Sequence, residues 1–387
     1  MVDTSSELPS DATSALLVYI TTVTPTTDSS KAIETYLKDK ADPHYRDEAG
    51  ASLLHLLAAK GNRAGVTAIL RAGAQWNAVD KAGKSVGEYA REAGHEELYQ
   101  YLVQEGVRTE FLLMALGASS TDAYEMDEGV EGEDEINEED SKASQEGEPE
   151  EPESYTAPSS EDVTVAPAGP ASAHPSNADY LSRRLTFSQG RLLDSDANAV
   201  MMGWEAPLME LHAAVISPRP GLSVLNVGFG LGLIDTYLQS HQPASHTIIE
   251  AHPDVYAKMI EDGWNKKPGV RILFGRWQDV LSDLEVYDGI FFDTFGEYYD
   301  DLKQFHEHLP NLLMHDGIYS YFNGLAGTNS FFHDVACGLA EADLEEMGIH
   351  TTFKEVVMDD LGDETWKGIK RAYWSLPLYR LPVCTFE

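Results

Sequence analysis

The 387-residue chain is longer than one typical domain, so we expect two folded units and a connection between them. It carries 65 acidic and 27 basic residues, which gives a formal net charge of −38 at pH 7. Direct binding to nucleic acid is not expected, because neutralising phosphates requires clustered lysine and arginine. A basic protein or a cationic substrate suits this charge better.

Cysteine content and hydropathy exclude further classes of protein. Cys337 and Cys384 cannot form a disulfide framework, and neither lies in a metal-binding spacing, so no metal site is expected. The first ten residues lack a basic segment followed by an apolar core, and no apolar run approaches the roughly eighteen residues of a membrane span. We therefore expect no membrane association and a location in the cytoplasm, with the nucleus also open.

Residue pairs 33 positions apart match in the first third of the chain, a period typical of ankyrin repeats. The period predicts a small all-α, ankyrin-like domain over residues 10–116, in which the second helix of each unit ends at Gly73 or Gly106. Residues 15–38 would add a further helical pair. Such a surface either binds a partner protein or only caps the second domain, and both alternatives stay open. The matching pairs are Asp47 and Asp80, Gly50 and Gly83, Ser52 and Ser85, Gly61 and Gly94, and Gly73 and Gly106.

The next segment, residues 117–177, predicts a linker. Between Asp122 and Asp162 there are 18 acidic residues and one basic residue, Lys142. Few aliphatic side chains are present, so the segment cannot bury enough apolar surface to offset the entropy of ordering it. We expect an acidic, disordered connection to a second domain over residues 178–387.

Apolar runs alternate with helical segments in this second domain, which indicates a Rossmann-like α/β fold with a mostly parallel sheet. The last two runs are joined by a polar connection and should pair antiparallel, giving seven strands with an antiparallel last strand. The expected strands are 223–227, 247–250, 270–274, 289–293, 318–322, 351–358 and 372–382.

A glycine-rich loop, Gly228-Phe229-Gly230-Leu231-Gly232, follows the first of these strands directly. The second strand ends at Glu250, at the spacing from the glycines where an acidic residue meets a nucleoside ribose. Leu233 occupies the place of the third glycine in a dinucleotide-binding fingerprint. That difference and the antiparallel ending favour S-adenosyl-L-methionine over NAD as the cofactor.

Five segments in the same order resemble guanidinoacetate methyltransferases. Together with the preceding repeats, the chain resembles the fungal and plant family of protein arginine N5-methyltransferases, the type IV enzymes, which have a class I methyltransferase fold. The resemblance covers both expected folded parts. The five segments are 200–209, 227–230, 248–250, 275–279 and 287–294.

The resemblance implies roles for individual residues. Met201 and Met209 would flank the cofactor, Glu250 would hold its ribose, and Trp277 with Gln278 would lie by the adenine. The glycine loop and its neighbours would complete the cofactor site, through Gly228, Phe229, Gly230, Gly232, Ala251 and Asp293. Glu205 and Asp293 would be the catalytic residues that hold the guanidino group.

Elementary chemistry supports the two carboxylates independently. A guanidinium stays protonated at neutral pH, and its delocalised nitrogens are poor nucleophiles. Glu205 and Asp293 could orient the planar cation by charge-assisted hydrogen bonds and accept the released proton. The plainer alternatives are that Glu205 is a surface acid, that Asp293 caps a helix, and that Trp204 and Trp277 are core residues.

The predicted reaction is methyl transfer to the δ (N5) nitrogen of an arginine in a protein. The resemblance implies that the substrate protein belongs to the large ribosomal subunit. Two alternatives remain: an enzyme for a small guanidino acid, and a non-catalytic ankyrin adaptor. Residues 180–198 are predicted to cover the cofactor as a lid, or else to form a packed flanking helix. His306 and His308 are assigned to a solvated helix face.

Overall fold

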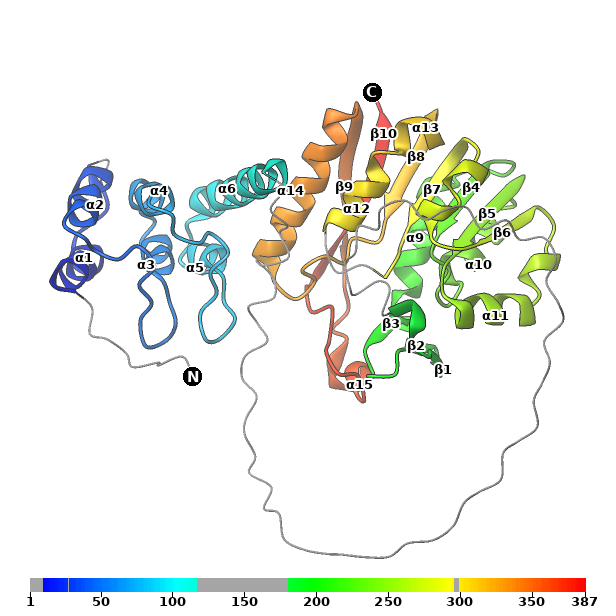
Figure 1. The fold of residues 1–387 in the computed structure, drawn as a ribbon, viewed down its shortest axis with the longest axis horizontal. Coiled ribbons are helices and arrows are strands. Elements are labelled where there is room, and N and C mark those ends of the chain that lie inside the picture. Colours follow the sequence, from blue (N-terminus) through cyan, green and yellow to red (C-terminus); the bar gives the residue numbers. More distant parts are fainter. Residues whose placement is uncertain (1–9, 27, 117–179, 296–298) are drawn as a thin grey trace, which may run out of the picture.

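The computed structural model describes residues 10–26, 28–116, 180–295 and 299–387. The linker predicted over residues 117–177 lies outside these ranges. Figure 1 shows a row of paired helices on one side and a layered α/β unit on the other. Within the described ranges, no helix combines the length and apolarity needed to cross a membrane.

The first part consists of helical pairs whose connecting turns repeat. The side chains of Asp47 and Asp80 each accept hydrogen bonds from the backbone N–H groups two and four residues further on. Ser52 and Ser85 then cap the helices that follow, each in a capping box. The sequence period therefore corresponds to a repeated local structure, and the helical pair predicted within 15–38 is present. The helices are α1 (Asp11–Thr22), α2 (Ser29–Lys38), α3 (Leu53–Ala59), α4 (Arg63–Arg71), α5 (Val86–Glu92) and α6 (Glu96–Ala115).

The prediction that a helix ends at Gly106 is wrong. Helix α6 continues through Gly106 to Ala115. A side chain at this position would lie 2.8 Å from the Trp76 ring and 2.9 Å from Val335. The glycine is therefore required by close packing, which spacing alone could not distinguish from a helix stop.

The second part is built on a seven-stranded sheet with the order β6-β5-β4-β7-β8-β10-β9. Neighbouring strands pair parallel except at β10, which is antiparallel to both β8 and β9. The predicted sheet is thus confirmed. Its strands are β4 (Ser223–Val227), β5 (Ser245–Glu250), β6 (Val270–Phe274), β7 (Tyr287–Phe292), β8 (Leu313–Tyr321), β9 (Ile349–Val357) and β10 (Leu378–Phe386).

Several strand boundaries differ from the prediction, most of all those of the last strand. That strand spans Leu378–Phe386, whereas the sequence predicted 372–382. Strand β8 begins at Leu313, ahead of its predicted start at residue 318. The residues between α15 (Gly362–Trp366) and β10 form a connection that carries Tyr373 and Trp374 inward. Aromatic residues favour strands in general, but here they fill a space next to the sheet instead.

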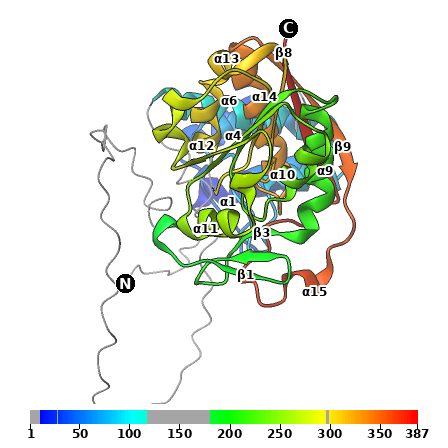
Figure 2. The same cartoon turned by 90° about the vertical axis from the view of Figure 1, so that its right-hand side faces the viewer.

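Helices cover both faces of the sheet, and alternate strand residues reach different layers. Val224 packs with α9 (Ala206–Ile216), α10 (Leu233–Ser240) and α11 (Pro253–Glu261). Its neighbour Leu225 packs with α12 (Tyr299–His306), α13 (Leu309–Leu312) and α14 (Ser330–Glu346) on the other face. A small antiparallel sheet of β1 (Thr186–Ser188), β2 (Arg191–Leu193) and β3 (Ala199–Met202) lies next to α15 in both views (Figures 1 and 2).

The helical part docks firmly on the second part through α14. Asp334 accepts hydrogen bonds from the Tyr99 hydroxyl at 2.6 Å and from Arg91 at 3.1 Å, and pairs with Arg380 at 2.8 Å. The Phe331 ring packs against the rings of both Trp76 and Tyr99. A continuous apolar cluster joins the two parts, so helices α5 and α6 are held in a fixed position beside the sheet.

The assignment of His306 to a solvated face is also wrong. The ring is fully buried, and its Nδ1 lies 3.2 Å from the Asp343 carboxylate. Burial lowers the pKa of His306, and the Asp343 carboxylate opposes that shift. The Nδ1 of His306 and the Asp343 carboxylate pair between α12 and α14, and helix spacing alone does not reveal this contact.

Candidate active site

The glycine loop crosses the carboxyl ends of β4 and β7. Gly228 has a φ of +95°, and a β-carbon there would lie 1.8 Å from the carbonyl oxygen of Asp293. No residue with a side chain fits that space. Gly230 and Gly232 also have positive φ, and the loop leads directly into α10. The backbone is thereby brought next to Asp293 and left open for close approach of a ligand.

Glu250 ends β5 and fastens this loop. Its Oε2 accepts the N–H groups of Phe229 at 3.0 Å and Gly230 at 3.4 Å, and its Oε1 accepts that of His252 at 2.6 Å. Burial raises the pKa of Glu250, and these backbone donors oppose the shift. Each carboxylate oxygen has two lone pairs, so a ribose diol beside Ala251 could still donate to this side chain.

The two predicted methionines lie in different surroundings. Met201, at the end of the small sheet, places its Sδ 3.2 Å from the N–H of Leu231 in the glycine loop. Met209 is fully buried within α9 and packs in the apolar core. The structure therefore brings Met201 to the loop, while Met209 contributes to the core that supports it.

Trp277 and Gln278 follow β6 in a short helix, Trp277–Asp279. The Trp277 ring is buried and packs edge-on against Phe305 at 5.3 Å and against His308 at 5.5 Å between ring centres. Gln278 is exposed. These contacts suit the core alternative for Trp277, and a contact of either side chain with an adenine stays a prediction.

Glu205 lies at the start of α9, and Pro207 sets the first turn of that helix. The side chain is buried, and its Oε1 accepts the Met202 N–H at 2.7 Å and the Tyr373 hydroxyl at 2.5 Å. Burial raises the pKa of Glu205 to about 7, and the two hydrogen bonds oppose that rise. The surface-acid alternative is therefore wrong, and Glu205 is poised to change its protonation state near neutral pH.

Asp293 follows β7 directly and lies close enough to Glu205 for their charges to interact. Its Oδ2 is buried, and no described residue gives it a hydrogen bond. Burial raises the pKa of Asp293 well above its ordinary range, and the nearby charge of Glu205 raises it further. A buried carboxylate oxygen without a hydrogen-bond partner, beside a second acid that is buried, is costly unless a cation joins them.

Aromatic rings lie beside Glu205. The Trp204 ring lies 5.5 Å from that of Tyr373 and 6.1 Å from that of Trp366, measured between ring centres. Trp204 is thus part of an aromatic cluster, and Tyr373 supplies a hydroxyl to the site. Sequence reasoning missed Tyr373 because the segment Ala372–Pro382 resembled a strand.

The segment predicted as a lid lies across the loops that follow β5 and β7. The Tyr180 ring stacks on Phe295 with centres 4.1 Å apart, and Arg184 pairs with Asp254 at 2.8 Å. A turn at Gly190 joins β1 to β2. Residues 180–202 therefore form a short helical turn and three strands over this edge, rather than a packed flanking helix.

The assembled groups fit a nucleoside-containing cofactor and a planar cation. The glycine loop and Glu250 offer a backbone cradle with an acceptor for hydroxyl groups. Glu205 and Asp293 offer two carboxylates for a guanidinium. Among the described residues, no cluster of three or more histidine, cysteine or acidic side chains could hold a metal ion.

The strand order, the glycine loop after the first strand of the large sheet, and the acid after the second define a class I S-adenosylmethionine-dependent methyltransferase. The family model described as guanidinoacetate N-methyltransferase matches residues 189–360.

Relatives with a curated name extend the match over most of the chain. Protein arginine N-methyltransferase 2 of Aspergillus fumigatus is 40% identical over 82% of this chain and 76% of its own length. The protein of that name from Cryptococcus neoformans is 35% identical over 87% and 86%, and that from Saccharomyces cerevisiae is 35% identical over 81% and 75%. The chain belongs to the protein arginine N-methyltransferase 2 family and is an S-adenosylmethionine-dependent enzyme, not a non-catalytic adaptor.

Solved structures match less closely. The O-methyltransferase TomG from Streptomyces achromogenes, in complex with SAM, is 15% identical over 46% of this chain and 79% of its own, with a TM-score of 0.34. TYW2 of M. jannaschii, in complex with AdoMet, is 14% identical over 52% and 84%, with a TM-score of 0.34. Scores this low carry no argument about the site.

Proposed function

We propose that this enzyme methylates the δ (N5) nitrogen of an arginine residue in a protein. The observation that carries the proposal is the pair of neighbouring acids: Glu205, buried at the start of α9, and Asp293, which follows β7 and has a buried Oδ2. A site that buries two carboxylates without a counter-charge selects a cation, and a guanidinium has the charge and the planar donors to satisfy both.

The acid pair can also handle the proton that the reaction releases. Bound S-adenosylmethionine supplies a methyl group on a positively charged sulfur. The N–CH3 bond forms as the S–CH3 bond breaks, and the attacking nitrogen loses one proton. Asp293, whose Oδ2 has no other described partner, is the proposed acceptor, while Glu205 holds the cation in place. The proton then passes to solvent when the product leaves.

Choice of the δ nitrogen follows from how two carboxylates would grip a guanidinium. If Glu205 accepts hydrogen bonds from the terminal nitrogens and Asp293 accepts one from the N–H of the δ nitrogen, the proton acceptor lies at the reacting atom, whose face is left open to the methyl donor. Holding the reacting atoms in line at near-contact distance accounts for most of the expected acceleration. The family resemblance supports the same nitrogen.

A protein substrate is supported by the curated relatives, whose names specify protein arginine. A basic ribosomal protein of the large subunit is the substrate that we propose from the family resemblance, and the net charge of −38 favours a basic partner. We also propose that helices α1 to α6 form an ankyrin-like domain with a protein-binding surface. A cytoplasmic location, with the nucleus open, goes with these proposals.

The proposal is tested with the full chain, methyl-deuterated S-adenosylmethionine and arginine-containing peptides. Fragmentation of the modified peptide distinguishes methylation at the δ nitrogen from methylation at a terminal nitrogen. The expected result is a deuterated methyl group on the δ nitrogen alone. Label on a terminal nitrogen would contradict the assignment of the nitrogen, but not that of the enzyme.

A free small guanidino acid is the competing substrate, favoured by the family model over residues 189–360. Guanidinoacetate is therefore included at equal concentration in a parallel reaction. Methyl transfer to guanidinoacetate without methyl transfer to any arginine peptide would contradict the proposal of a protein substrate.

A further inference from the structure

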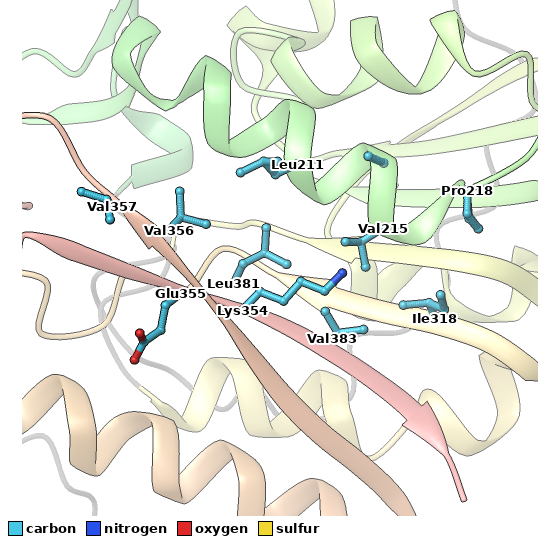
Figure 3. Close-up of a pocket in the computed structure, with 11 residues that line it drawn as sticks. Leu211, Val215, Pro218, Ile318, Lys354, Glu355, Val356, Val357, Leu381 and Val383 are labelled. Atoms are coloured by element: carbon cyan, nitrogen blue, oxygen red, sulfur yellow. The ribbon is translucent and has the colours of Figure 1, made fainter.

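An apolar groove lies on the face of the sheet that α9 covers incompletely. Helix α9 packs on β7 and β8, while the far face of β9 is covered by α14. Between α9 and β9 this leaves a groove of about 730 Å³. Figure 3 shows Leu211, Val215 and Pro218 along one wall, and Val356 and Leu381 opposite them.

The lining of the groove is aliphatic. The charged exceptions are Lys354 and Glu355. In Figure 3, Lys354 extends across the groove toward α9, while Glu355 points away from it. Val357 is 80% exposed and Leu211 40% exposed, so a covering partner would remove both from water. An accessible apolar groove of this kind is typical of an interaction site.

One wall of the groove leads from the candidate active site. Its wall, α9, begins at the residue after Glu205, the acid proposed to hold the guanidinium. Its floor residue Leu381 belongs to the same apolar cluster as Trp204 and Tyr373, which surround Glu205. A chain that places an arginine beside Glu205 and runs along α9 therefore brings its neighbouring residues to the groove.

We propose that this groove binds the segment of the substrate protein next to the target arginine. The proposal rests on the function proposed above. It specifies aliphatic side chains in the substrate, held in an extended conformation along α9. The ammonium of Lys354 is available to a main-chain carbonyl of that segment, which an extended chain leaves free. Exposed Glu210, on the helix that forms one wall, suits the basic residues of an arginine-rich protein.

The dimensions give the spacing of the motif. From Glu205 to Leu211 the helix rises about 9 Å, which an extended chain covers in about three residues. From Glu205 to Pro218 the distance is about 20 Å, or about six residues of extended chain. Aliphatic residues are therefore expected about three to six positions from the target arginine, on one side of it.

The test uses three peptides of about 15 residues in a lysine, glycine and serine background, each with one arginine. One peptide has leucine and valine three to six positions before the arginine, one has them after it, and one has none. KM and kcat are measured with the full chain, and fluorescence anisotropy gives the affinity for each peptide. One aliphatic peptide should have a KM roughly tenfold below that of the plain peptide at similar kcat, since burying two side chains is worth at least that factor.

The variant Leu211→Ser/Val357→Ser should abolish this advantage and leave the plain peptide unaffected. Leu112→Ser/Val18→Ser is the matched control, because it removes two aliphatic side chains that are 52% and 60% exposed on other helices. The control should retain the full advantage. All four substituted side chains are largely exposed, so folding should not be compromised.

Each outcome bears on a different claim. Methylation of all three peptides with equal KM would overturn the groove and leave the proposed function standing. Tighter binding of an aliphatic peptide without any methylation would support the groove and overturn the function. If light scattering gives a dimer that Leu211→Ser/Val357→Ser converts to a monomer, the occupant is a second copy of the chain and the proposal is wrong.

Discussion

The candidate active site treats its carboxylates in two opposite ways. On the cofactor side, Glu250 accepts three backbone N–H groups of the glycine loop and its neighbourhood, and this loop is complete without a ligand. On the side of the acid pair, Asp293 has a buried oxygen with no partner among the described residues, and burial raises the pKa of Glu205 to about 7. The cofactor side is thus preorganised for its ligand. On the side of the acid pair, the buried Oδ2 of Asp293 lacks a hydrogen-bond donor that a bound cation could supply.

Removal of the Asp293 carboxylate should have the largest effect on turnover. Asp293→Asn should lower kcat by roughly a thousandfold, within the range for the loss of a general base. Equilibrium dialysis should show at most a few-fold change in binding of S-adenosylmethionine, because Glu250, its loop and the Asp293 backbone next to Gly228 are retained. The exposed Asp316 provides a matched control in Asp316→Asn. Turnover by Asp293→Asn within a factor of about ten of the unsubstituted enzyme would contradict the assigned role.

A substitution on the preorganised side should act on folding instead. Gly228→Ala drives a β-carbon into the Asp293 carbonyl and should lower the free energy of unfolding by at least about 3 kcal/mol. Gly190→Ala is the matched control, since Gly190 also has a positive φ but no atom lies within 4 Å of the added carbon. Its cost should be about 1 kcal/mol. Urea denaturation measures both, and equal costs would remove the argument for close packing at Gly228.

The acid pair should make the free energy of unfolding depend on pH. The pKa of Glu205 is about 7 when folded and 4.5 in its ordinary range. The folded state therefore binds the proton more tightly, so the Glu205 contribution is fully present below pH 4.5 and is lost as pH rises through 7. Glu205→Gln should thus be more stable than the unsubstituted enzyme at pH 8, by up to about 3 kcal/mol, and similar to it at pH 4.

Thermal unfolding in the absence of peptide measures this difference. Glu210→Gln, on the exposed side of α9, should show no such pH dependence. A Glu205→Gln variant that is less stable than the unsubstituted enzyme at pH 8 would show that the carboxylate is satisfied by its own surroundings.

The smallest expected effect is that of Tyr373. Its hydroxyl stabilises the charged form of Glu205, so Tyr373→Phe should raise the pKa on the acidic limb of the kcat/KM profile by about one unit. Activity lost at pH 6.5 should return at pH 8.5. A uniform loss across the pH range would mean that Tyr373 acts through packing with Trp204 and not through the hydrogen bond.

The sequence predicted the strands and the glycine loop of the site more accurately than the side-chain contacts between distant parts of the chain. Strands β4 and β6 match their predictions residue for residue, because short apolar runs between turn residues permit little else. Gly228 and Glu250 were found because a fixed spacing links them across one β-α-β unit. Local sequence carries this information directly.

Tyr373, Gly106 and His306 were misread for a common reason. The Tyr373 hydroxyl meets Glu205 across 168 positions of sequence, Gly106 packs against another part of the molecule, and His306 pairs with an aspartate on a distant helix. Each of these contacts is set by tertiary packing, which overrides local propensity. A single sequence carries no signal for such a pairing.

Binding of a guanidinium should release a proton from the acid pair, Glu205 and Asp293. Calorimetric titration of an arginine peptide into enzyme saturated with S-adenosylhomocysteine, in two buffers of different ionisation enthalpy, counts the protons released. At pH 6.5 the account predicts release of about one proton per peptide, and much less from Glu205→Gln. Binding with no proton release at this pH would contradict it.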